Sequence, residues 1–159
     1  DVVFAHQGGL HDPGLRAFFL QMNAPRPVSE ATGPDPITAV ERVIIRTHDA
    51  DRAAALYGAR LGLEMRLDQA MGPARMMFFR CGDLTLEVLA TPDAEPGRDR
   101  LWGLSWRGAD MAPQHARIAA AGFSVSELRE GRGPGTRIFT VRDGTCGVPT
   151  VVLQPAPAR

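Results

Sequence analysis

The sequence contains no lysine, so arginine supplies all 18 of its Lys and Arg residues. Eighteen acidic residues balance them, and the formal net charge is zero. A protein that binds nucleic acid carries a basic excess, and one that binds an anionic membrane surface carries a basic cluster. Because neither is present, we expect no nucleic acid and no membrane among the partners.

Cysteines and long apolar runs are also scarce. The two cysteines, Cys81 and Cys146, are too few for a disulfide framework. No stretch approaches the roughly 20 apolar residues of a membrane-spanning helix, and no signal-peptide pattern is visible. We therefore predict two free thiols and a cytoplasmic location.

What is present suits one globular domain, because 159 residues with 44% apolar side chains can build a buried core. Residues 43–45 are β-branched and predict a strand. Asp49 or Asp51 can cap a helix, and Gly62 suits its left-handed end. Apolar residues recur between them at the helical period, namely Ala53, Leu56, Tyr57 and Leu61.

The same layout returns about sixty residues later. Residues 104–107 predict a strand, Asp110 a cap, residues 111–121 a helix and Gly122 its end. The cap and the glycine are 13 residues apart in the first copy and 12 in the second. This regularity indicates an internal repeat.

Three strand-like segments follow each helix, so each copy has the order βαβββ. They are residues 64–67, 74–81 and 84–89 in the first copy, and 124–128, 136–142 and 149–154 in the second. We predict two modules, about residues 38–92 and 101–155, in an α+β fold. The glycine-rich residues 131–135 predict a hairpin loop, because no helix follows them as a phosphate-binding loop requires.

The first 36 residues have a different composition. Residues 2–5 predict a short strand, such as the last strand of a preceding module. Asp12-Pro13 opens a predicted helix over residues 12–23, and residues 24–36 hold four prolines and predict a linker. The main domain is then residues 37–159. An apolar stripe marks the helix as a docking element, formed by Leu15, Phe18, Phe19 and Met22.

Short motifs at matching places carry a resemblance to a known family. They are Arg46-Thr47-His48-Asp49 with Leu56-Tyr57 and Leu61-Gly62-Leu63, then Phe-Phe-Arg-Cys-Gly-Asp at 78–83, and Gly147-Val148-Pro149-Thr150. Over roughly residues 38–155 the chain resembles the glyoxalase / bleomycin-resistance / extradiol-dioxygenase group, the vicinal oxygen chelate superfamily. The resemblance implies two βαβββ modules that form a curved mixed sheet around a cavity.

The superfamily's metal enzymes take one ligand from each of four strand positions, and the resemblance locates these positions here. They fall on Arg42, on Glu87, on Gly103 or Leu104, and on Val152. Guanidinium and aliphatic side chains cannot bind a divalent cation. We therefore expect no metal and no cofactor.

Arg42 and Glu87 suggest a different use of the same space. Strand alternation places Glu87 with Thr85 on the face that should line the cavity, where the guanidinium of Arg42 could pair with it. If the register shifts by one residue, Glu41 takes the inward position and the pair is lost. The alternative for Glu87 is an ordinary, partly exposed strand glutamate.

Further ligand-binding candidates come from the same strands. Phe79 and Trp106, with Leu104 and Val152, could line the cavity, although most aromatic side chains at such positions belong to the core. Five arginines could make the cavity mouth basic or could simply be solvated: Arg80, Arg107, Arg129, Arg132 and Arg137. The four histidines have no ligand spacing.

Three functions remain open from the sequence. The first is a domain that binds a small aromatic or carboxylate-bearing molecule in its cavity without a metal. The second is a metal-dependent lyase or dioxygenase, and the third is an interaction module that acts through its N-terminal helix. We expect a small-molecule ligand and a homodimer, and the two modules could pair within one chain or between two.

Overall fold

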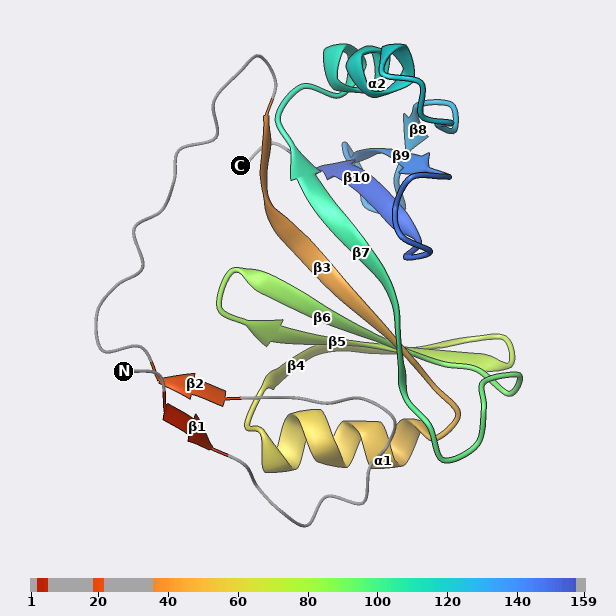
Figure 1. The fold of residues 1–159 in the computed structure, drawn as a ribbon. Coiled ribbons are helices and arrows are strands. Elements are labelled where there is room, and N and C mark those ends of the chain that lie inside the picture. The colour runs from red at the N-terminus through yellow and green to blue at the C-terminus, as the bar shows by residue number, and fades with distance from the viewer. Residues whose placement is uncertain (1–2, 6–18, 22–35, 157–159) are drawn as a thin grey trace.

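The computed structural model of the chain describes residues 3–5, 19–21 and 36–156. Within this part, eight strands form one mixed sheet against which two helices pack (Figure 1). Two short strands, β1 (Val3–Ala5) and β2 (Phe19–Gln21), form a separate antiparallel pair. None of the described helices is long and apolar enough to cross a membrane.

The predicted helix over residues 12–23 is wrong where the structure describes it. Phe19–Gln21 is strand β2, whose Phe19 pairs with Ala5 of β1. A short apolar run fits a helix or a strand, and pairing with β1 supplies backbone partners to this one. The rest of that helix, with Leu15, Phe18 and Met22, and nearly all of the predicted linker lie outside the described residues. The domain boundary near residue 37 therefore stays a prediction.

The first module follows the predicted order. Asp49 caps the helix through its Oδ1, which accepts a hydrogen bond from the N–H of Arg52 at 2.9 Å, and Gly62 ends it at φ +69°. Its second half is a π-helix, because the N–H of Leu61 donates to the carbonyl of Leu56. The elements are β3 (Ile37–Thr47), α1 (Ala50–Ala54) with its π-helical continuation (Ala55–Arg60), β4 (Glu64–Met71), β5 (Ala74–Cys81) and β6 (Leu84–Ala90).

The second module repeats this order, with Asp110 as the helix cap and Gly122 at φ +90° after it. The predicted strand at 124–128 is largely absent. The N–H of Thr140 donates to the side-chain hydroxyl of Ser126 at 2.9 Å. In a regular β-ladder this N–H would donate to a backbone carbonyl. The elements are β7 (Arg100–Gly108), α2 (Met111–Ala120), β8 (Arg129–Glu130), β9 (Arg137–Val141) and β10 (Thr150–Gln154).

The strand order is β4-β5-β6-β3-β7-β10-β9-β8, so the second module mirrors the first. The two modules meet where β3 pairs antiparallel with β7, and this pairing occurs within one chain. Inside each module the first strand is parallel to the last, β3 to β6 and β7 to β10. The predicted α+β fold with a mixed sheet is confirmed.

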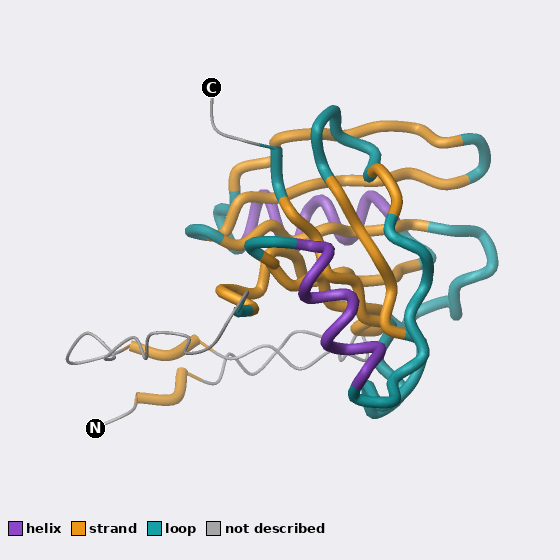
Figure 2. Tube along the Cα trace, turned by 90° about the horizontal axis from the view of Figure 1, so that it is seen from above, coloured by secondary structure: helices purple, strands orange, loops and turns teal. Residues whose placement is uncertain are grey.

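Both helices cover the same face of the sheet, as the strand register shows. Residues paired across strands share a face, and one row runs through Phe79, Leu86, Val43, Leu104, Thr150 and Val141. Phe79 and Leu86 belong to the core cluster under α1, and Val141 belongs to the cluster under α2. We call this side the covered face and the other the open face. Figure 2 shows the two helices at separate places against the strands.

Candidate functional site

The open face carries polar residues across the junction of the two modules. One row consists of paired residues from five neighbouring strands: Arg80, Thr85, Arg42, Ser105 and Val151. A second row holds Phe78, Glu87, Ile44 and Gly103. Alternation along β6 therefore places Thr85 and Glu87 on the open face, as predicted.

Two β-bulges increase the number of charged residues beside this face. The register of β3 against β7 shifts at Glu41, and that of β4 against β5 shifts at Arg66. A bulge adds one residue to its strand and re-aims the neighbouring side chains. Glu41 accepts a hydrogen bond from Arg107 at 2.6 Å, while Arg42 pairs with Glu87. The alternative in which the Arg42–Glu87 pair is lost is therefore wrong.

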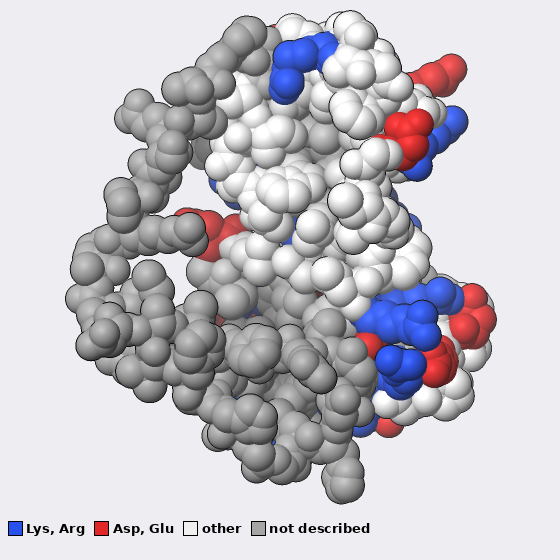
Figure 3. Space-filling model, viewed as in Figure 1, with Lys and Arg blue, Asp and Glu red and all other residues white. Residues whose placement is uncertain are grey.

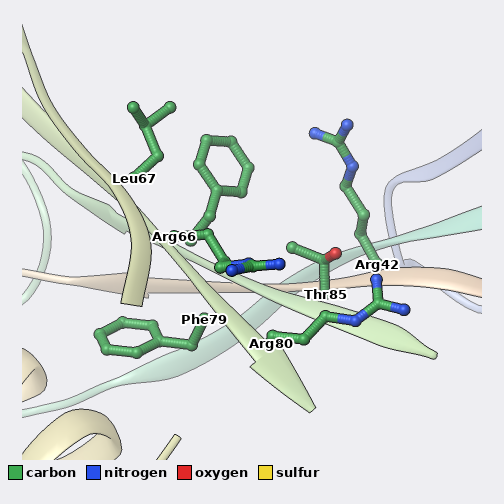
Figure 4. Close-up of a pocket in the computed structure, with 7 residues that line it drawn as sticks. Arg42, Arg66, Leu67, Phe79, Arg80 and Thr85 are labelled. Carbon is green, nitrogen blue, oxygen red and sulfur yellow. The ribbon is translucent and has the colours of Figure 1, made fainter. Parts of the chain in front are cut away.

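A pocket of about 310 Å³ lies on the open face of the first module. Figure 4 shows Arg42, Arg66 and Thr85 on one side of the strands and Phe79 on the other. The polar wall comes from three arginines and a threonine, and the apolar wall from Phe78 and Leu67. The lining residues are Arg42, Arg66, Leu67, Phe78, Phe79, Arg80 and Thr85.

Arg42 is held by two neighbours. Its Nη1 lies 3.4 Å from the Oε2 of Glu87, and its guanidinium carbon lies 5.3 Å from the centre of the Phe78 ring. The side chain of Arg42 is 34% exposed and that of Glu87 is 15% exposed. A cation over an aromatic face is orientated as well as stabilised, so these contacts fix the guanidinium while one side of it remains accessible.

The other two pocket arginines have only weak acidic partners. Arg66 pairs with Glu64 at 2.7 Å, and Arg80 lies 3.5 Å from Asp83, but both pairs are solvent-exposed. Exposed ion pairs contribute little and exchange readily with other anions. No carboxylate is among the residues that line the pocket, so the acidic partners of its arginines lie outside the lining.

A second, smaller pocket near the start of β7 has a different charge balance. Arg46 pairs with Asp93 at 2.5 Å, and this contact holds the pKa of Asp93 at about 2, well below its ordinary value. Arg98 and Arg100 both pair with Glu95. Figure 3 shows basic and acidic side chains gathered together at the lower right of the molecule. Because two carboxylates line this pocket beside its three arginines, it is the weaker candidate for an anion.

Several predicted site residues lie on the covered face. Val152 is in the core under α2, and its strand partner Trp106 shares that face. Leu104 pairs with Val43 on the same side, and Phe79 is fully buried with its ring 5.8 Å from that of Tyr57, although it borders the pocket. The expectation that Leu104, Trp106 and Val152 line the cavity is therefore wrong, since the register places their strand neighbours there instead. Phe79 faces the core but still borders the pocket.

Sequence reasoning missed three residues of the pocket, Arg66, Leu67 and Phe78. Alternation along β5 could have identified Phe78, because Phe79 shares a face with the core residue Met77. Arg66 and Leu67 depend on the bulge in β4, for which the sequence gives no signal.

The open face does not fit the divalent metal that the superfamily's metal enzymes hold. Glu87 is one carboxylate, and its neighbours Arg42, Phe78 and Ile44 provide no ligand atom. Across the described part of the chain, no three His, Cys, Asp or Glu side chains come together as a metal site would need. Ser105 and Val151 take the matching row in the second module, and they do not complete a ligand set.

The geometry defines a class of protein, a two-module α+β domain with a pocket on the face of its sheet that neither of the described helices covers. The family model of the Glyoxalase/Bleomycin resistance protein/Dioxygenase superfamily matches residues 39–149. The chain belongs to this superfamily, which confirms the resemblance found in the sequence. No protein of curated function matches it.

Solved structures share the fold. Methylmalonyl-CoA epimerase from Mycobacterium tuberculosis matches with a TM-score of 0.65 and 18% identity, over 82% of this chain and 94% of that chain. A variant of the Streptomyces coelicolor methylmalonyl-CoA epimerase in complex with 2-nitronate-propionyl-CoA matches with a TM-score of 0.60 and 23% identity, over 76% of this chain and 99% of that chain. A hypothetical protein from Bacillus halodurans matches with a TM-score of 0.62 and 12% identity, over 76% of this chain and 96% of that chain. At these identities the likeness shows the fold alone.

Proposed function

We propose that this domain binds a small organic carboxylate in the open-face pocket without a divalent metal. The observation that carries the proposal is the convergence of Arg42, Arg66 and Arg80 on a pocket that no carboxylate lines. Arginine is suited to such a ligand because its planar fork matches a carboxylate in a bidentate way.

The apolar wall narrows the class of ligand. Phe78 and Leu67 offer a surface for an aromatic ring or a short branched acyl group. A volume of about 310 Å³ is at the lower end for ligand pockets, so only a small group can be enclosed. Some of the epimerases similar in fold were solved with CoA esters, one of them with methylmalonyl-CoA. An acyl carboxylate like that of methylmalonyl-CoA would fit this pocket while the larger part of such a ligand stayed outside.

The other two functions lack a supporting observation in the described residues. A metal-dependent lyase or dioxygenase needs ligands that the open face does not provide. An interaction module would act through the predicted N-terminal helix, but residues 19–21 of that helix form strand β2 instead. Homodimer formation and the cytoplasmic location stay predictions.

Calorimetric titration tests the proposal. The probes are benzoate, methylmalonate and methylmalonyl-CoA, each with and without EDTA. We expect at least one probe to bind in both conditions, and Arg66→Gln and Arg80→Gln to weaken it about tenfold, since a hydrogen bond to a charged group contributes about 1.5–3 kcal/mol. Arg117→Gln, on the exposed side of α2, is the matched control and should bind normally.

Two outcomes would contradict the proposal. If none of the probes binds, the pocket is not a carboxylate site. If a probe binds only after a divalent cation is added, the metal-free part of the proposal fails.

A further inference from the structure

Arg132 links the two modules across the open face. It lies in the loop between β8 and β9 of the second module, yet its Nη1 donates to two methionine sulfurs of the first. The Sδ of Met76 is at 3.4 Å and that of Met71 at 3.8 Å. The curved sheet therefore brings this loop over strands β4 and β5.

The two methionines lie on the same face as the pocket. Met76 alternates with Phe78 along β5. Met71 of β4 is paired with Ala74, which lies two residues before Met76 in β5 and so shares its face. Residues two apart on a strand are separated by about 7 Å, so Arg132 sits one step along the strand from the pocket. Met76 is 5% exposed but belongs to neither core cluster, which is consistent with cover by this loop.

The contacts of Arg132 are weak for a guanidinium. A thioether sulfur is a poor acceptor, and no carboxylate in the part of the chain that the structure describes forms an ion pair with Arg132. Arg42, Arg66 and Arg80 each have an acidic partner. Arg132 is therefore the arginine beside this pocket whose charge is not compensated.

The loop that presents Arg132 is already formed. The N–H of Gly131 donates to the carbonyl of Thr136 at 2.9 Å, and the N–H of Thr136 donates to the carbonyl of Gly133 at 3.1 Å. A Cβ on Gly131 would come within 2.3 Å of the Thr136 hydroxyl, so this close turn requires glycine. Only the side chain of Arg132 has to turn towards the pocket, which keeps the entropy cost of recruiting it low.

We propose that Arg132 is a further ligand-binding residue, which leaves the two methionine sulfurs and binds the carboxylate held in the pocket of the first module. The ligand site is then shared by both modules, although the pocket itself is lined by one. This inference deepens the proposed function and rests on it.

The experiment measures the dissociation constants of benzoate and methylmalonyl-CoA for the unmodified chain, Arg132→Gln, Arg132→Lys and Arg137→Gln. We expect Arg132→Gln to weaken binding about tenfold, because one charge-assisted hydrogen bond is lost, and Arg132→Lys to weaken it less. Arg137 is the control, because it alternates with the core residue Phe139 and so lies on the covered face. The ligand-free unfolding midpoint should be the same in all four proteins, which a purely structural role of Arg132 would not give.

The outcomes separate the two proposals. If Arg132→Gln binds as tightly as the unmodified chain while Arg66→Gln is weakened, this inference is overturned and the proposed function stands. If the unmodified chain binds neither probe, the proposed function fails and the role of Arg132 falls with it. A lower unfolding midpoint of ligand-free Arg132→Gln would assign the residue to stability instead.

Discussion

Arg52, in the first helix, donates a hydrogen bond to the fully buried carboxylate of Asp99, in the segment that leads into β7. The same Nη2 lies 3.3 Å from the hydroxyl of Thr47 at the end of β3. One guanidinium thus ties α1, β3 and the connection between the modules. The two partners differ in solvent access, because the side chain of Arg52 is 35% exposed and that of Asp99 is 0% exposed.

This difference predicts unequal costs for breaking the pair. Arg52→Gln leaves a buried carboxylate without its counter-charge and should lower the free energy of unfolding by about 3–5 kcal/mol. Asp99→Asn leaves an arginine that water can reach and should cost less, about 1–3 kcal/mol. Urea denaturation measures both, with Arg60→Gln as the exposed control on the same helix. Equal costs for the two variants would show that burial does not set the energetics of the pair.

Ionisation of the buried phenol of Tyr57 should destabilise the folded protein at high pH. Burial, with the carboxylate of Asp99 nearby, raises the pKa of this phenol well above its usual value, and its hydroxyl has no hydrogen-bond partner among the described residues. The unfolded pKa is about 10, so stability is complete below that pH and is lost as the pH rises above it.

The chain has a single tyrosine, so tyrosinate absorbance reports on this residue alone. We expect the absorbance and the circular dichroism of unfolding to change together as the pH is raised. Tyr57→Phe should reduce the alkaline loss of stability. Appearance of tyrosinate while the fold stays intact would contradict the prediction.

Substitution of Gly144, in the turn after β9, should destabilise the fold by a steric clash. Its φ is +66°, and an added Cβ would lie 2.3 Å from the ring of Phe123. Gly72 has a similar φ of +60° but open space around it. We expect Gly72→Ala to cost about 1 kcal/mol from backbone strain and Gly144→Ala about 2–3 kcal/mol, since overpacking adds to the strain. Thermal unfolding compares them, and the extra cost should disappear in a Phe123→Ala background.

Arg42 and Glu87 predict a modest coupling energy. Their charged atoms are 3.4 Å apart and Arg42 is about one-third exposed, so solvent screens the pair. A double-mutant cycle of Arg42→Gln and Glu87→Gln should give a coupling of about 0.5–1 kcal/mol in chemical unfolding. Strict additivity would mean that the two residues act independently in the folded protein.

The fold was predictable because its local signals agree with one another. Asp49 and Asp110 cap their helices, and Gly62 and Gly122 end them at positive φ, as the spacing of the repeat indicates. The elements that failed lack such paired signals. Residues 19–21 carry no marker that separates helix from strand. The predicted strand at 124–128 is largely absent where the side chain of Ser126 accepts the N–H of Thr140.

The site was predictable only in part, because its position depends on strand register. Arg42 and Glu87 follow from alternation in β3 and β6, and they meet as expected. Leu104, Trp106 and Val152 were expected to line the cavity although the register puts them on the covered face. Register reflects bulges and long-range pairing, which do not leave a local signature in the sequence.

The pairing of β3 with β7 has a consequence for the order of folding. β3 completes the sheet of the first module by pairing with β6, and its other edge is then a row of unpaired backbone groups. Strand β7, which follows β6 in the chain, can add to that edge before the rest of the second module exists. We therefore expect the first module to nucleate the molecule, and mutations in its core under α1 to slow refolding more than mutations in the core under α2.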